Sequence, residues 1–88
     1  MVKYIRSKNV YSSELDGEIC IFESTNAEYL TLNETSTYIW KLISVPSSLN
    51  LIISKLRQTY EVNENTIFQD VEDFLNKGVD AGVIEYIG

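Results

Sequence analysis

The sequence predicts an α+β domain in which a three-stranded antiparallel sheet is followed by three helices. Strand-prone segments separated by tight turns fill the first third of the chain, and apolar residues recur at helical spacing in the rest. The chain has 88 residues, 44% of them hydrophobic, which is enough for one core and too few for two. We therefore expect residues 1–88 to form a single domain without repeats or linkers.

The three strands are expected to form a meander. Residues 10–14 and Glu18–Glu23 flank Asp16-Gly17, a pair that tolerates positive φ and is typical of hairpin turns. The second segment is apolar at consecutive positions, which indicates a central strand covered on both faces. Glu28–Leu32 follows a polar turn and is expected to be the third strand, at an edge of the sheet.

Two helices are expected between the sheet and residue 60. Asn33 is suited to cap the first, which would run to about residue 44, because Pro46 cannot continue it. Ser47 or Ser48 is expected to cap the second. The apolar face of that second helix recurs at the spacing of an amphipathic helix and consists of Leu49, Ile52, Ile53, Leu56 and Tyr60.

A third helix is expected to begin after Asn63 or Asn65 and to end before Gly82. Its core-facing positions are Ile67, Val71, Phe74, Leu75 and Val79. Residues 83–87 either return as a wing-like strand or pack on the core. These elements together predict a winged-helix-like outline, with the helices laid on one side of the sheet.

The residue types exclude most catalytic sites. The chain has no histidine and a single cysteine, Cys20, so it cannot form a Ser-His or Cys-His nucleophile pair or a Cys-x-x-Cys site. Its four glycines form no phosphate-binding loop, and its acidic pairs match no calcium-loop spacing. Cys20 lies in an apolar run and is expected to act as a small hydrophobe. We therefore expect no enzyme activity, no cofactor and no metal.

The net charge of -6 belongs entirely to the end of the chain. Six basic and six acidic residues balance through Tyr60, whereas beyond it seven acidic residues face only Lys77. An acidic third helix would repel nucleic acid phosphates, which disfavours the DNA-binding function that a winged helix otherwise suggests. The acidic helix either attracts a basic partner or is simply a solvated face.

No apolar run of signal-peptide length occurs in the first eight residues, and no stretch of about 18 apolar residues occurs anywhere. The sequence therefore predicts a cytoplasmic protein that has no membrane partner. A monomer is expected, with an exchange of N-terminal strands between two copies as the alternative.

The edge strand is the first candidate binding surface. Its unpaired backbone N–H and C=O groups could dock another extended chain, and no proline in Glu28–Leu32 prevents this. The alternative is an edge blunted by Glu28 and covered by the N-terminal residues 2–6. The third helix offers a second wall, because Phe68, Leu75 and Val79 make one flank more apolar next to Glu72. Phe68 could instead cap a small core.

Four segments, in order and spacing, resemble the signature of the PqqD family: EICIF (18–22), YLTLNE (29–34), YIW (38–40) and DVEDFL (70–75). The resemblance covers about residues 10–85. The YLTLNE stretch, which leads into a helix with Ile-Trp, is particularly similar to the stand-alone leader-binding proteins of lasso-peptide biosynthesis, which are called RiPP recognition elements.

This resemblance implies a non-catalytic domain that binds the leader of a ribosomally made precursor peptide and presents it to a separate modifying enzyme or leader peptidase. The leader would add as a strand to the third strand and pack against the third helix. The predicted peptide-binding residues are Glu28, Tyr29, Leu30, Thr31, Leu32, Phe68, Val71, Glu72, Leu75 and Val79. We further expect the acidic helix to select leaders that carry Lys or Arg.

The chain departs from the family pattern at Gly78, where leucine is more usual and where Val79 is a candidate for compensation. A glycine inside a helix costs about 1 kcal/mol relative to alanine. Lasso-peptide biosynthesis is the favoured setting. The alternatives are a carrier that serves a radical SAM enzyme in PQQ-type cofactor maturation, a winged-helix DNA-binding regulator, and a small subunit that only scaffolds an oligomer.

Overall fold

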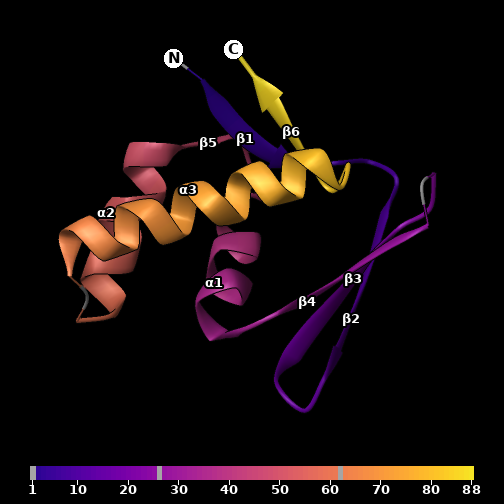
Figure 1. Ribbon diagram of the computed structural model, residues 1–88, viewed down its shortest axis with the longest axis horizontal. Helices are drawn as coiled ribbons and strands as arrows, with labels where there is room; N and C mark the ends of the chain where they lie inside the picture. The colour runs from indigo at the N-terminus through magenta and orange to yellow at the C-terminus, as the bar shows by residue number, and fades with distance from the viewer. Residues whose placement is uncertain (1, 26, 62) are drawn as a thin grey trace.

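The computed structural model describes residues 2–25, 27–61 and 63–88. In this part of the chain, two small antiparallel sheets and three helices form one layered unit (Figure 1). The predicted α+β class is confirmed. The elements in chain order are β1 (Lys3–Arg6), β2 (Val10–Leu15), β3 (Glu18–Glu23), β4 (Glu28–Leu32), α1 (Glu34–Leu42), β5 (Ser47–Ser48), α2 (Leu49–Thr59), α3 (Glu64–Asp80) and β6 (Ile84–Ile87).

The predicted meander is the sheet β2-β3-β4, with β3 at its centre. Asp16 and Gly17 both have positive φ, at 54° and 83°, as the two central residues of a type I′ hairpin turn require. The register pairs Tyr11 with Phe22 and Phe22 with Tyr29, so three aromatic residues form a row across the sheet.

The expectation that β3 is covered on both faces is wrong. Ile19 and Ile21 are buried on the inner face, against which α1 packs. Cys20 and Phe22 point to the outer face and are only half-buried there. Phe22 is shielded by its cross-strand neighbours, and its ring centroid lies 4.7 Å from that of Tyr29. An aromatic row, and not a second layer, therefore explains the consecutive apolar residues.

The second sheet has the order β5-β1-β6 and joins the two ends of the chain, which lie together in Figure 1. Lys3 pairs with Ile87, so the tail does form a strand. The alternative that residues 2–6 cover the edge of the first sheet is wrong, because β1 pairs with β5 and β6 instead. Arg6 fastens β1 to α1: its Nε donates to the Trp40 carbonyl at 2.8 Å, and its guanidinium lies 4.7 Å from the centre of the Trp40 ring.

The helix caps follow the predictions. The Asn33 side chain accepts a hydrogen bond from the Ser36 amide at 2.8 Å, and Ser48 caps α2 by accepting from the amide of Leu51. Asn63 caps α3, which ends at Asp80 before Gly82. The helix α1 ends at Leu42, slightly earlier than expected. None of the described helices is long and apolar enough to cross a membrane.

Gly78 is the point where α3 packs most closely on β6. Gly78 is buried, and a Cβ placed there would lie 2.8 Å from Cγ1 and 3.3 Å from Cβ of Ile84, and would also contact Cδ1 of that side chain. Ile84 is itself only 2% exposed, so it has little room to move. The glycine that departs from the family pattern is therefore a packing requirement of this chain.

We predict that Gly78→Ala destabilises the domain although alanine is the better helix former. The overpacking cost of about 1–3 kcal/mol exceeds the helix-propensity gain of about 1 kcal/mol. Urea unfolding would measure the difference. Asn76→Ala, at an exposed position of the same helix, is the matched control and is expected to leave stability unchanged or slightly raised. A Gly78→Ala protein as stable as the parent would contradict the packing argument.

Candidate functional site

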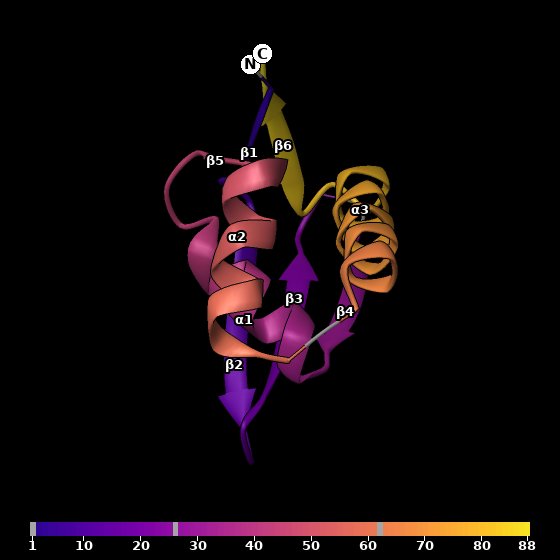
Figure 2. The ribbon, with the colours of Figure 1, turned by 90° about the vertical axis from the view of Figure 1, so that its left-hand side faces the viewer.

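The outer edge of β4 is open. Among the described residues β4 pairs only with β3, which leaves the main-chain groups on its other side without a strand partner. The helix α3 runs beside this edge, as Figure 2 shows where the helix is seen nearly end-on. The sheet therefore ends at a helix and not at another strand.

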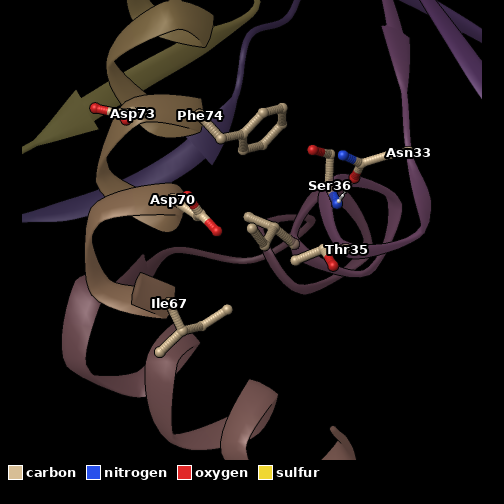
Figure 3. A pocket seen from close by; sticks show the side chains of 8 residues that line it. Asn33, Thr35, Ser36, Ile67, Asp70, Asp73 and Phe74 are labelled. Atoms are coloured by element: carbon tan, nitrogen blue, oxygen red, sulfur yellow. Dashed lines mark hydrogen bonds between the residues drawn. The ribbon is translucent and has the colours of Figure 1, made fainter. Parts of the chain in front are cut away.

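A groove separates the open edge from α3. It has a volume of about 280 Å³ and is lined by Leu30, Thr31, Leu32, Asn33, Ser36, Asp73, Phe74 and Lys77. A second hollow, of about 390 Å³, continues it past the first turn of α1 (Figure 3). The second hollow shares Asn33, Ser36, Asp73 and Phe74 with the first and adds Thr35, Ile39, Ile67 and Asp70. We call the two hollows together the β4–α3 groove.

The end of the groove at α1 combines an apolar wall with polar groups. Ile39 and Ile67 are buried beneath it, at 1% and 4% exposure. The Phe74 ring and the Asp70 carboxylate both point from α3 into the space (Figure 3). Asp73 lies at the rim and points away, where its Oδ1 accepts a hydrogen bond from Gln69 Nε2 at 2.8 Å.

The β4 residues predicted to bind a peptide are distributed between the two faces of the sheet. Leu30 and Thr31 line the groove, whereas Leu32 contributes mostly to the core, at 2% exposure. Tyr29 lies on the outer face, is 68% exposed and packs against Phe22. The backbone of Glu28 belongs to β4, and its side chain lies outside the described part of the chain.

The predicted residues of α3 do not wall this groove. Val71 and Leu75 are fully buried in the core, and Phe68 lines a different hollow together with Ile53 and Arg57 of α2. Glu72 is close enough to β1 to affect Tyr4, whose pKa is raised by burial and further by the charges of Tyr86 and Glu72.

The expectation that the Phe68 flank faces the third strand is therefore wrong. That flank is apolar because α2 and the core pack against it, and Val79 is partly buried there as well. A role in peptide binding for these side chains is implied only by the family resemblance, and the position of Phe68 beside α2 argues against it.

Sequence reasoning missed the residues that do face β4: Asp70, Phe74 and Lys77. At about 100° per residue these three share one flank of α3, on the opposite side of the core stripe from Phe68. Their common flank can be read from the sequence. Which of the two flanks faces β4 depends on how the helix is packed.

The outer face of the β2-β3-β4 sheet is a second surface of interest. Tyr11 and Tyr29 are both 68% exposed on either side of Phe22, and Leu15 is 75% exposed. A shallow hollow of about 440 Å³ beside this row is lined by Ser13, Leu15, Asp16, Glu18, Cys20 and Thr31. Within the described residues, no group of three or more His, Cys, Asp or Glu side chains could hold a metal ion.

Fold and site together define the class of the protein: a small α+β domain whose sheet has one open edge facing a helix across a groove. The family model described as coenzyme PQQ synthesis protein D (PqqD) matches residues 18–84, from β3 to the first residue of β6. The chain belongs to the PqqD family. The match includes both walls of the β4–α3 groove.

Two solved structures are similar over almost the whole chain. One, TbiB1 in complex with the TbiA(beta) leader peptide, is 23% identical and has a TM-score of 0.82, with 92% of this chain and 94% of that chain covered. The other, a lasso peptide synthetase B1 complexed with the leader peptide, is 17% identical with a TM-score of 0.80, and 93% and 96% are covered. These similarities show the shared fold. No curated protein sequence matches the chain significantly.

Proposed function

We propose that the chain binds the leader segment of a ribosomally synthesised precursor peptide and presents it to a separate processing enzyme, with a lasso-type leader peptidase favoured. The open edge of β4, which faces α3 across a groove, is the observation that carries this proposal. An extended peptide that adds to β4 would pair its backbone with the free N–H and C=O groups.

The groove provides what backbone pairing cannot, which is selectivity among side chains. Alternate residues of an added strand would point toward α3, where Phe74 and the buried Ile39 and Ile67 offer apolar contacts. Burying one apolar anchor there would contribute roughly 1.5–3 kcal/mol. Both hollows of the groove are open to solvent, so an extended chain can reach them from outside the domain.

The similar structures support the choice of ligand, because both are described as complexes with leader peptides. We propose that this chain carries out no chemistry. It would act by tethering: a leader held on β4 keeps the rest of the precursor close to the enzyme and raises the effective concentration of that enzyme's substrate.

The outer face of the sheet supports contact with a protein partner. Tyr11 and Tyr29 are exposed there on either side of the half-buried Phe22, on the same sheet to whose edge the leader would add. An enzyme seated on this face would lie beside the bound leader, in position to receive the precursor.

The matching family model favours a second setting, because its description names the synthesis of coenzyme PQQ. In that case the same groove would bind a precursor for a radical SAM enzyme. DNA binding has less support, because the exposed positions of α3 include Asp70, Asp73 and Asp80.

We predict that a leader peptide shifts the amide resonances of Glu28–Leu32 and of residues 70–77, whereas duplex DNA shifts neither. The peptide to use is the synthetic N-terminal half of a short precursor, to be sought among the open reading frames that neighbour this gene. An NMR titration of the labelled protein would measure both. Shifts confined to the α2–α3 hollow around Phe68 would contradict the proposed site.

We predict that Phe74→Ala weakens leader binding about tenfold, because its ring forms the apolar wall of the groove. Phe68→Ala removes the same group from the opposite flank of α3 and is expected to have little effect. Fluorescence anisotropy with a labelled leader would measure both affinities. Since Phe74 is half-buried, thermal unfolding of each variant and the milder Phe74→Leu would separate lost binding from lost folding. Equal losses in the two alanine variants would count against the groove.

We predict an alternating pattern when single backbone amides of the leader are methylated. In an added strand, the N–H groups of alternate residues point to β4, and those between them point away. Methylation at the first set should weaken binding more than about tenfold, because each methyl group removes a hydrogen bond and blocks the edge. Methylation at the second set is the internal control. A helical leader would show no such alternation.

A further inference from the structure

We propose that the β4–α3 groove reads the order of charges along the leader: basic residues precede the segment that pairs with β4, and acidic residues follow it. This inference rests on the proposed function and concerns the same groove. The sequence-based expectation is that an acidic helix selects leaders with Lys or Arg, without saying where along the leader those residues lie. The geometry of the groove indicates their position.

The direction of the groove follows from its lining. Leu30 and Thr31 of β4 lie opposite Lys77 and Phe74, whereas Asn33 and the first turn of α1 lie opposite Asp70 and Ile67. As the chain advances along β4 toward α1, the α3 residues that face it therefore come from progressively earlier positions in the helix, from Lys77 back to Ile67. The strand β4 and the helix α3 run antiparallel.

The direction of the bound peptide follows from the sheet. Both strand pairs of the β2-β3-β4 sheet are antiparallel, and antiparallel pairing is the more stable arrangement per residue. A leader added antiparallel to β4 runs parallel to α3. Its earlier residues lie at Asp70 beside α1, and its later residues lie at Lys77.

The two ends of the groove differ in charge. The Asp70 carboxylate points into the hollow at the α1 end, whereas Lys77 lines the other end. Asp73 borders both hollows, and its carboxylate points away from them. The remaining described acids of the helix lie elsewhere: Glu72 is on the flank toward Tyr4, and Asp80 is exposed beyond the groove. Among the described acidic side chains of α3, Asp70 is therefore the one that points into the groove and would face the leader.

The N-terminus of α1 also lies at the Asp70 end, and its dipole carries the equivalent of about half a positive charge. Asn33 caps this terminus and Glu34 stands in its first turn, so the positive end is partly compensated. The negative charge of the Asp70 carboxylate is larger than the partial positive charge that remains at the N-terminus of α1. The local field at this end therefore favours a cation.

The other lining groups suit a long basic side chain. The methylene stem of Lys or Arg can lie along Ile39, Ile67 and Phe74 while its head reaches the Asp70 carboxylate. The hydroxyl oxygens of Thr35 and Ser36 are further acceptors at this end. An acidic side chain in the same hollow would face a like charge, so a leader bound in reverse would lose contacts at both ends.

The test uses, in three versions, the synthetic leader half of a short precursor to be sought among the open reading frames that neighbour this gene. The first is the natural peptide, the second has every Lys and Arg before its strand-forming segment replaced by Gln, and the third carries the same charges in reversed order. Each is titrated against the parent protein, Asp70→Asn, and the control Asp80→Asn, which removes the same charge outside the groove. Affinities are measured at about 0.05 M and about 0.5 M salt.

We expect neutralisation to weaken binding about fivefold, the effect of one partly exposed ion pair, and reversal to weaken it more than tenfold. Asp70→Asn should remove the difference between the natural and neutralised peptides, and Asp80→Asn should preserve it. If all three peptides bind the parent equally, or if Asp70→Asn changes nothing, the charge reading is overturned while leader binding stands. A natural leader that binds tightly with no basic residue before its strand segment overturns it as well. If no version moves the amides of β4, leader binding itself fails.

Discussion

The candidate site depends on one feature of the described structure: the main-chain groups on the outer side of β4 have no strand partner. The chain has other short strands, and β1 could in principle have paired with the open edge of β4. It does not, because β1 pairs with β6 and β5 and is fastened to α1 by the contacts of Arg6 with Trp40. The ends of the chain close on each other, and the sheet that carries the groove is left open.

The position of α3 turns an open edge into a groove. Val71 and Leu75 anchor the middle of the helix in the core, and Gly78 allows its last turns to lie directly on Ile84 of β6. With these three positions fixed, the flank of Asp70, Phe74 and Lys77 must face β4. Side chains that never touch the groove therefore decide which residues line it.

Local chemistry allowed much of the fold to be predicted from the sequence. The Asp16-Gly17 turn and the caps at Asn33, Ser48 and Asn63 depend only on residues near them in the chain. The pairing of Lys3 with Ile87 does not, because it joins the two ends of the chain and leaves no local pattern. For that reason the second sheet was not predicted.

The candidate site was predicted only in part, for a related reason. The edge strand follows from the order of the meander. The helical period, in contrast, locates the core stripe of α3 but treats its two flanks alike. The more apolar flank, with Phe68, is the one that packs beside α2, while the groove uses the flank in which Phe74 stands between charged residues. Apolar character is thus a signal of packing as much as of binding.

An open edge is also a hazard, because a second copy of the same strand could pair with it. In this chain the edge is only five residues long, and it belongs to a domain with net charge -6. Two copies that approach through this edge each carry that net charge, and their mutual repulsion opposes the pairing. A leader with basic residues meets the opposite condition. The acidic excess of the chain, which would attract a basic leader, therefore also acts against self-association, so the two effects have a common electrostatic origin.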